Sequence, residues 1–260
     1  MSSEYLAVKN LSMAYGETII QHGLDFTINK GDIFIIMGGS GCGKSTLLRH
    51  MIGLQRPLLG DIYYNKQALW QAAPQTQRRI LQHTGVLFQS GALLSSMTLA
   101  ENVALPISTA TRLSARKINE IVNYKLALVG LAGFGNYYPA ELSGGMQKRA
   151  GLARAMALDP EILFCDEPSA GLDPVSAKLL DDLLLSLRDS LSTTIVMVTH
   201  ELASIFAIGT NSVFLDAESK TMLAVGPPKQ LLNTCTNPKV QDFLTRSNPQ
   251  SAHPNLGGIL

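Results

Sequence analysis

The sequence predicts an α/β fold in which a mainly parallel sheet is combined with a mostly helical block. Two patterns point to this class. Short apolar runs typical of buried strands alternate with amphipathic helical stretches in both halves of the 260-residue chain, as in strand–helix–strand units. Between Phe88 and Glu161 the pattern is helical instead, which predicts an inserted helical subdomain.

The first third of the chain is rich in strand signals. We expect strands at Tyr5–Val8, Leu24–Ile28, Ile33–Met37, Asp61–Tyr64 and Val86–Phe88. Turn-forming residues at 15–16 and 29–32 separate the first three strands. A helix is expected from about Ser45 to Gly53, directly after a glycine-rich segment.

The clearest helical period lies at Leu113–Leu131, where apolar residues recur every three or four positions until Gly130 and Gly133 end it. The later elements are expected to be strand Glu161–Cys165, helix Pro174–Leu191, strand Thr194–Val198, helix Glu201–Ile208 and strand Ser212–Leu215. We therefore expect one domain over 1–246, with a core at 1–90 and 158–246, a helical subdomain at about 91–157, and a Ser/Asn/Pro/Gly-rich tail at 247–260.

Composition narrows the class of protein. Hydrophobic residues make up 46% and charged residues 16%, which is typical of a globular protein, and the net charge of +1 gives no electrostatic reason to expect nucleic acid as a partner. The cysteines have no metal-type spacing, and Cys42 and Cys165 are expected to be buried in a reducing compartment. No apolar stretch is long enough to span a membrane, and the first residues lack a basic-then-apolar export pattern, so we expect a cytoplasmic protein.

Residues 38–46 form a complete G-x-x-x-x-G-K-S phosphate loop between a strand and a helix. Its glycines let backbone amides wrap a triphosphate, and the helix N-terminus adds unpaired N–H groups. Lys44 is expected to reach the β- and γ-phosphates and Ser45 to bind Mg²⁺. The candidate nucleotide-binding residues are Gly38, Gly39, Ser40, Gly41, Cys42, Gly43, Lys44, Ser45 and Thr46. An ordinary glycine-rich turn is the alternative, but it rarely carries the whole pattern, so we expect nucleotide binding.

Adjacent carboxylates, Asp166 and Glu167, end the apolar run 162–165. Side chains alternate along a strand, so the two acids cannot share one role. We expect Asp166 to complete the Mg²⁺ shell and Glu167 to face the water that attacks the γ-phosphate. Two acids at a strand end are a weak signal alone and become a strong one beside a phosphate loop.

A second anion site is predicted at Ser143-Gly144-Gly145, because Ser143 is placed to cap the helix that follows and the glycines expose backbone amides. A plain helix cap is the alternative. His200 ends another buried run, at the sheet edge where α/β proteins bind ligands. A single His there is usually structural, but beside these motifs it is expected to contact the γ-phosphate.

Together these residues resemble the ATP-binding cassette (ABC) family over nearly the whole chain. The resemblance implies an N-terminal antiparallel β subdomain and places residues 38–46 as Walker A and 162–167 as Walker B, with Glu167 as the catalytic base. It adds Tyr15 as the aromatic residue that stacks on adenine, Gln89 as a contact to Mg²⁺ and the attacking water, and Asp173 in the D-loop. Residues 142–146 match the signature motif, with Met146 where many cassettes have Gln.

A signature motif cannot fold onto the Walker A segment of its own chain. Two copies are therefore expected to pack head to tail, with each ATP between Lys44 of one copy and Ser143 of the other. The predicted enzyme is an ATPase whose dimer opens after hydrolysis and drives a permease.

A finer resemblance, to the cassettes of MCE- or Mla-type bacterial lipid transport, rests on the segments 88–106, 142–155 and 237–244. It implies phospholipid transport between inner and outer membranes, with the cassette on the cytoplasmic face of the inner membrane. The implied partners are a permease, a periplasmic MCE-domain protein and a STAS-domain subunit, and residues 250–260 are expected to order on dimerisation. Leu93, Leu94, Met97 and Leu99 are available either to line a permease groove or to pack inside the helical subdomain.

Two alternatives keep the ATPase core and change its use. A small-solute importer cassette, for example of the amino-acid type, differs mainly at the Q-loop and the C-terminus. A soluble, non-transport ABC protein usually carries two cassettes, coiled-coil insertions or basic arms, and this sequence has none of them. A neighbouring permease gene beside an MCE gene favours lipid transport, and a neighbouring solute-binding protein gene favours the importer.

Overall fold

The computed structural model describes residues 3–246. Its centre is a six-stranded sheet ordered β10-β9-β3-β8-β7-β6, in which β9 through β6 run parallel and β10 pairs antiparallel with β9. The strands are β3 (Ile33–Gly38), β6 (Thr84–Leu87), β7 (Ile162–Asp166), β8 (Thr194–Val198), β9 (Asn211–Leu215) and β10 (Met222–Val225). This confirms the predicted α/β class with a mainly parallel sheet.

A second sheet, ordered β2-β1-β4-β5, is antiparallel. Its strands are β1 (Glu4–Tyr15), β2 (Thr18–Asn29), β4 (Leu59–Tyr64) and β5 (Gln67–Ala68). The first two strands are longer than the sequence indicated. Asn10 has a φ of 44°, and the pairing of β1 with β2 shifts register between Val8 and Leu11. Such a bulge breaks the two-residue alternation on which strand prediction depends.

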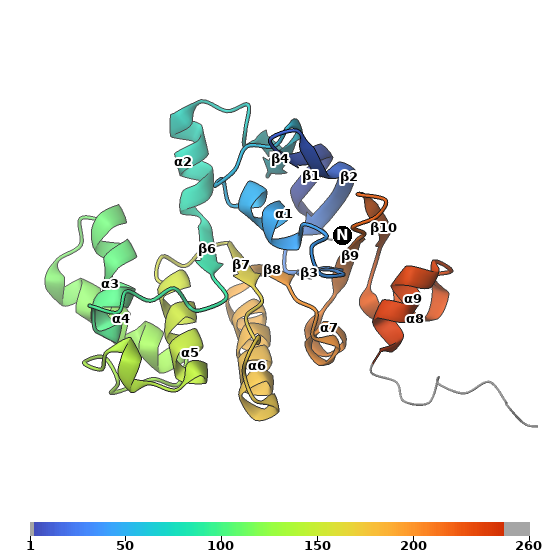
Figure 1. Cartoon of the computed structure of the whole chain (residues 1–260). Coiled ribbons are helices and arrows are strands. Elements are labelled where there is room, and N and C mark those ends of the chain that lie inside the picture. Colours follow the sequence, from blue (N-terminus) through green and yellow to red (C-terminus); the bar gives the residue numbers. More distant parts are fainter. Residues whose placement is uncertain (1–2, 247–260) are drawn as a thin grey trace, which may run out of the picture.

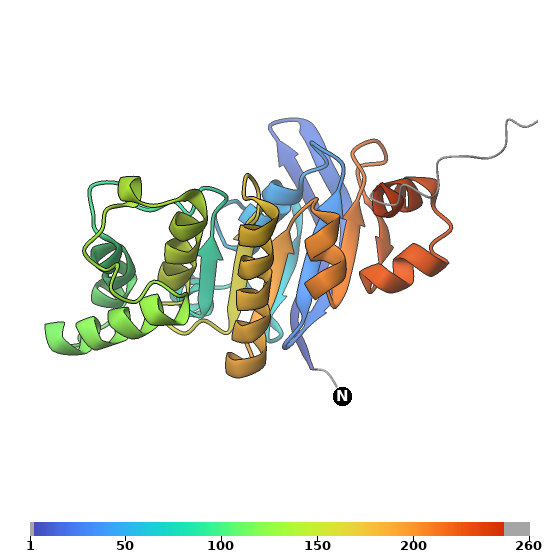
Figure 2. The same cartoon turned by 90° about the horizontal axis from the view of Figure 1, so that it is seen from below.

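The helices lie on both faces and at both ends of the central sheet (Figure 1). They are α1 (Lys44–Met51), α2 (Pro74–Gln82), α3 (Leu99–Ala110), α4 (Ala115–Leu128), α5 (Gly144–Ala155), α6 (Pro174–Leu191), α7 (Leu202–Ile208), α8 (Pro228–Thr234) and α9 (Pro238–Thr245), with a 3₁₀ turn at Pro139–Glu141. Helices α3 to α5 lie at one end of the molecule and α8 and α9 at the other, as Figure 2 also shows. No helix within residues 3–246 is long and apolar enough to cross a bilayer.

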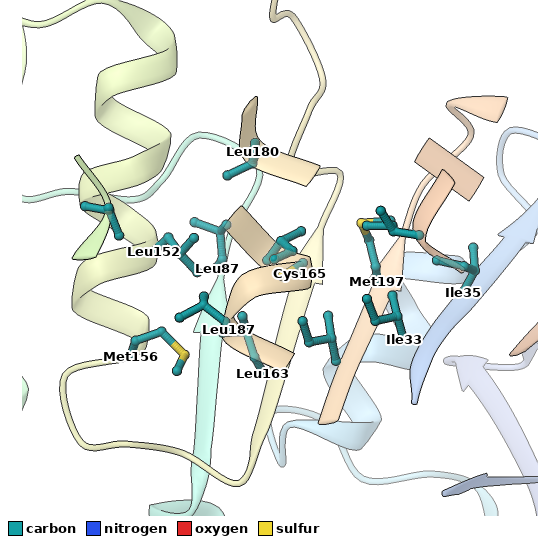
Figure 3. Close-up of a cluster of buried hydrophobic side chains, with 14 of the residues drawn as sticks. Ile33, Ile35, Leu87, Leu152, Met156, Leu163, Cys165, Leu180, Leu187 and Met197 are labelled. Atoms are coloured by element: carbon teal, nitrogen blue, oxygen red, sulfur yellow. The ribbon is translucent and has the colours of Figure 1, made fainter. Parts of the chain in front are cut away.

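Alternating side chains of the parallel strands build two hydrophobic cores, one on each face of the central sheet. On one face, Ile33 and Ile35 pack with β7 and β8 against α5 and α6. Figure 3 shows this cluster, which includes Leu87, Leu152, Met156, Leu163, Cys165, Leu180, Leu187 and Met197. On the other face, Phe34 and Ile36 pack against α1 and the antiparallel sheet. The central sheet is therefore a buried middle layer whose strand ends are held rigidly.

Most remaining elements agree with prediction. Helix α6 and strand β8 have the expected bounds, whereas α2, α8, α9 and β10 were not predicted. Helix α2 buries only Ile80, so it has no apolar stripe to recognise. Inside the predicted helical region 91–157, residues 91–98 and 129–138 are loops. The tail at 247–260 lies outside the described residues.

Candidate nucleotide-binding site

A cleft of about 600 Å³ opens at the carboxyl ends of β3, β7 and β8. This edge of a parallel sheet is where α/β proteins bind ligands. The lining residues are Tyr15, Ile20, Gly38, Gly39, Ser40, Gly41, Gly43, Lys44, Ser45, Thr46, Glu167, His200 and Arg246. The structure thus brings most of the predicted phosphate loop together with Tyr15, Glu167 and His200.

The loop's shape depends on glycine. Gly38 has a φ of +148°, and a Cβ placed there would lie 2.3 Å from the carbonyl oxygen of Leu215, so no other residue fits. Gly41 has a φ of +74°, and a Cβ there would meet open space, which is room for a ligand to approach the backbone. Gly43 precedes α1 and has no side chain to cap it. The first N–H groups of α1 are therefore available to an anion.

Lys44 and Ser45 line the cleft, and Asp166, which is not part of the lining, is hydrogen-bonded to Ser45. Nζ of Lys44 donates to the carbonyl oxygens of Gly39 (2.9 Å) and Gly38 (3.1 Å). The hydroxyl of Ser45 donates to Oδ1 of Asp166 at 3.0 Å. This pair of hard oxygen donors suits Mg²⁺, which takes one or two protein oxygens together with phosphate oxygens and water. Within residues 3–246 there is no cluster of three metal-binding side chains, and such a Mg²⁺ site does not need one.

Glu167 is held in an unusual conformation at the mouth of the cleft. Its φ is 48°, in the left-handed region that a side chain rarely adopts, and such strain concentrates at functional sites. Oε1 lies 2.9 Å from Nδ1 of His200, and the side chain is only 14% exposed. Oε2 is buried and accepts no hydrogen bond from any group within residues 3–246. A buried carboxylate oxygen without a partner is costly, and it fits a site that completes its hydrogen bonds with a ligand or water.

Tyr15, the last residue of β1, is half exposed over α1. Its hydroxyl lies 3.5 Å from Oγ1 of Thr46 and 3.3 Å from a guanidinium nitrogen of Arg49. These two contacts lower the pKa of Tyr15, the Thr46 contact most. The ring is accessible at the cleft, as stacking on a base requires.

Cys42 anchors the phosphate loop to the protein interior through its buried side chain and its carbonyl oxygen. Its thiol is buried, and burial raises its pKa. Its carbonyl oxygen accepts from Nε2 of Gln21 at 2.7 Å, and the same nitrogen donates to the carbonyl of Asp216 at 2.8 Å. Cys42 is absent from the cleft lining, so its side chain packs the loop and leaves ligand contact to its neighbours.

The predicted signature and D-loop residues lie away from this cleft. Ser143 caps α5, because its hydroxyl accepts from the backbone N–H of Met146 at 3.3 Å. Gly144 and Gly145 form the first turn of α5, and Asp173 caps α6 by accepting from Val175 and Ser176 N–H groups at 3.0 Å. Hydrogen bonds from Ser176 and Val175 hold the pKa of Asp173 below its usual value. None of these residues lines the cleft of their own chain.

Gln89 lies exposed just after β6 and is also absent from the lining. Two lining residues were missed by the sequence analysis. Ile20 belongs to β2, and Arg246 directly follows α9. Neither belongs to a motif, and their presence depends on how β2 and α9 pack beside the loop.

Fold and site together define a P-loop nucleotide-binding protein. A family model described as ABC transporter matches residues 21–170, more than half of the chain. The chain belongs to the ABC transporter family.

Relatives of known name agree with this assignment. The chain is 38% identical to the intermembrane phospholipid transport system ATP-binding protein MlaF of Haemophilus influenzae, over 90% of this chain and 88% of the relative. It is also 38% identical to the probable ribonucleotide transport ATP-binding protein mkl of Mycobacterium tuberculosis, over 92% of this chain. The chain spans 66% of that relative's length. The methionine import ATP-binding protein MetN of Brucella abortus is 33% identical over 96% of this chain and 67% of its own.

Solved structures share the fold. The structure of cbiO1 from Clostridium perfringens, part of an ABC transporter complex, superposes with a TM-score of 0.81 at 25% identity, over 95% of this chain and 97% of that one. The dimeric structure of MJ0796, a bacterial ABC transporter cassette, gives a TM-score of 0.77 at 29% identity, over 85% and 97%. These likenesses confirm the cassette fold expected from the sequence.

Proposed function

We propose that this chain hydrolyses ATP with Mg²⁺ and works as a dimer that powers a membrane permease for phospholipid transport. One observation carries the hydrolytic part. The Glu167 carboxylate is held against His200 at the mouth of a phosphate loop, with one oxygen buried and unpaired among the described residues. A carboxylate placed in this way is suited to orient and activate a water.

The other cleft residues take complementary roles in this proposal. Lys44 and the α1 N-terminus hold the phosphates, and Tyr15 stacks on the base. Ser45 and Asp166 hold Mg²⁺, which when bound neutralises charge on the β- and γ-phosphates. His200 orients Glu167 and reaches the γ-phosphate. Gln89 lies outside the cleft, and we propose it as a residue that would contact Mg²⁺ and the attacking water in the nucleotide-bound protein.

The proposed dimer follows from the separation of the two anion sites. Ser143, Gly144 and Gly145 start α5 and are absent from the cleft, so a partner copy is needed to bring them onto a bound nucleotide. The MJ0796 cassette, which was solved as a dimer and also in a post-hydrolysis state with ADP and Pi, supports this arrangement. We propose that Asp173 lies near the same interface.

The identity to MlaF supports phospholipid as the cargo. We propose that the chain lies on the cytoplasmic face of the inner membrane. The partners are a permease, and beyond it an MCE-domain protein and a STAS-domain subunit. We propose the domain division expected from the sequence, with a core at 1–90 and 158–246 and a helical subdomain at about 91–157, and we propose that the segment after β6 contacts the permease. The exposed side chains of Phe88 and Leu94 fit such a contact.

A second candidate is a cassette for small-solute import. The similarity to MetN, named for methionine import, favours it, as does the name of the mycobacterial relative. The two candidates share the ATPase site and differ in the permease.

The test is to purify the tagged chain from membranes of its own host and identify the integral membrane protein that accompanies it. The complex is then placed in liposomes, and ATP hydrolysis is measured with fluorescent phospholipid or with candidate solutes and their binding protein. Phospholipid movement that needs ATP and is lost with Glu167→Gln supports the proposal. Hydrolysis stimulated only by a solute-binding protein favours the importer. A chain that neither hydrolyses ATP nor accompanies a permease would contradict both.

A further inference from the structure

Arg246 lines the nucleotide cleft, although it lies at the far end of the described chain and belongs to none of the motifs. We infer that Arg246 binds the phosphate chain of the nucleotide held by the phosphate loop of its own chain. This inference rests on the proposed nucleotide function. It assigns a second fixed cation to the site, beside Lys44.

Phe243 holds the Arg246 guanidinium group in position, and the two terminal nitrogens of the group remain available for a ligand. It stacks over the ring of Phe243, with the central carbon 4.3 Å from the ring centroid, and Nε donates to the Phe243 carbonyl at 3.4 Å. Phe243 is buried and packs edge-on against Phe214 of β9, with ring centroids 5.3 Å apart. The two terminal amino groups of Arg246 make no hydrogen bond to a group within residues 3–246. They are the donors that bind phosphate in pairs.

Helix α9 is fixed to the sheet at its other end as well. Nζ of Lys239 lies 2.9 Å from Asp216 and 2.7 Å from Glu218, and these acids raise its pKa. Gln241 donates to three carbonyl oxygens at the end of α8, at 2.7 to 3.1 Å. The position of Arg246 is therefore set by α8, α9 and β9 together.

The carboxyl end of β9, to which α9 is attached through Asp216, is also joined to the phosphate loop. The carbonyl of Asp216 and the carbonyl of Cys42 share the side-chain amide of Gln21, at 2.8 and 2.7 Å. The carbonyl of Leu215 packs directly against Gly38. Arg246 and the loop are thus attached to one rigid support, so the cation keeps its place relative to a bound phosphate chain.

Charge gives the reason for a phosphate partner. Among the lining residues, Lys44 and Arg246 are permanent cations and Glu167 is the anion. A nucleoside triphosphate is a polyanion, so a second cation strengthens its binding. The competing interpretation is that Arg246 only closes the end of α9 through its stacking on Phe243.

The test is calorimetric titration of the full chain with Mg²⁺ and a slowly hydrolysed ATP analogue, ADP or AMP. Arg246→Ala and Arg246→Gln are expected to weaken binding of the analogue and of ADP by roughly 5- to 20-fold, with a smaller effect on AMP. Arg246→Lys keeps the charge but lacks the paired donors, so it is expected to recover only part of the affinity, and the loss is expected to shrink as salt rises. The matched control is Arg116→Ala, which removes a largely exposed guanidinium from α4 and is expected to leave affinity unchanged.

Two results would overturn the inference. One is an affinity within twofold of wild type for both Arg246→Ala and Arg246→Gln, measured on variants whose melting temperature is unchanged. The other is an equal loss for AMP, ADP and the triphosphate. Lys44→Ala is titrated beside them: if it abolishes binding while the Arg246 variants bind normally, only this inference fails. If Lys44→Ala also binds normally, the proposed nucleotide function fails.

Discussion

Nδ1 of His200 lies 2.9 Å from Oε1 of Glu167, across the ends of two adjacent parallel strands. Strand register brings them together. Asp166 of β7 pairs with Val198 of β8, and the backbone N–H of Glu167 donates to the Val198 carbonyl at 2.9 Å. The residues that follow each strand therefore meet at the cleft. The sheet itself sets the direction of the carboxylate before any ligand binds.

Glu167→Gln is expected to bind ATP with near-normal affinity and to lower turnover by about 10²- to 10⁴-fold, the usual contribution of a general base. The amide keeps the size of the side chain and loses the charge that activates water. Since hydrolysis is what opens the proposed dimer, this variant is expected to accumulate as an ATP-bound dimer. Size-exclusion chromatography with and without ATP and a steady-state phosphate assay measure both effects. Normal turnover would remove Glu167 from its role.

His200→Ala is the companion to that variant. Without the imidazole the Glu167 carboxylate loses its partner, so we expect kcat to fall about 10- to 100-fold with a smaller change in KM. His22→Ala, on β2 and outside the cleft lining, is the control and is expected to match wild type. A rise in KM alone, with kcat unchanged, is inconsistent with the positioning role.

Lys44→Ala is expected to abolish productive ATP binding. Nζ of Lys44 lies within 3.1 Å of the loop carbonyls, beside the space over Gly41, and each charge-assisted hydrogen bond to phosphate is worth about 1.5–3 kcal/mol. Fluorescence titration with a labelled nucleotide measures the change. Lys9→Ala, which removes an exposed lysine paired with Asp25, is the control. Unchanged affinity in Lys44→Ala would falsify the phosphate-loop assignment.

Ser143→Asp tests whether each site takes its second anion contact from the partner. Asp preserves the cap of α5 and repels phosphate, so turnover is expected to fall at least about tenfold in Ser143→Asp alone. Mixing Ser143→Asp with Lys44→Ala chains places both defects in one composite site and leaves the other intact. Recovery of activity on mixing is expected.

A site completed within one chain would show no such recovery. Ser114→Asp is the control for the substitution itself. It makes the same change at the cap of α4, where Ser114 accepts from Lys117 at 3.4 Å. Turnover of this variant is expected to equal that of wild type.

Asp216→Asn tests the attachment of α9 and its pH dependence. Hydrogen bonds from the Ser219 backbone and Lys239 lower the pKa of Asp216 from 3.8 to about 2. Because the folded pKa is the lower one, this stabilisation is fully present above about pH 4 and is lost as pH falls towards 2. Asn is expected to cost about 1 kcal/mol, or about 2–4 °C in Tm.

Thermal melts at pH 7 and pH 2.5 measure this difference. We expect the gap between wild type and Asp216→Asn to narrow at the lower pH, because at pH 2.5 the unfolded carboxylate is largely protonated while the folded one is only partly so. Asp25→Asn, in the exposed pair with Lys9, is expected to change Tm less at either pH. A gap that persists unchanged in acid would show that the carboxylate charge does not hold α9.

The sequence predicted the motif-bearing part of the site and little of its surroundings. Residues 38–46, Glu167 and His200 follow strands whose apolar runs are clear, and parallel strands bring their ends together by geometry. Ile20 and Arg246 reach the cleft through β2 and α9, which is tertiary packing that no local pattern encodes. The bulge at Asn10 hid the length of β1 for a similar reason, because it interrupts the period. The predicted roles of Ser143, Asp173 and Gln89 need a partner or a movement and stay predictions.

Lys148, in the helix that begins just after Ser143, donates to the carbonyl of Ala170 at 2.5 Å, in the turn between Glu167 and Asp173. Burial lowers the pKa of Lys148, and Gly145 packs against Ser176 of α6. The start of α5, which we propose contacts the partner's nucleotide, is thus hydrogen-bonded to the turn that follows β7 at the chain's own nucleotide cleft. In a symmetric pair, the start of α5 that each chain offers to its partner would therefore be connected by this lysine-to-carbonyl contact to the turn that follows the chain's own Glu167.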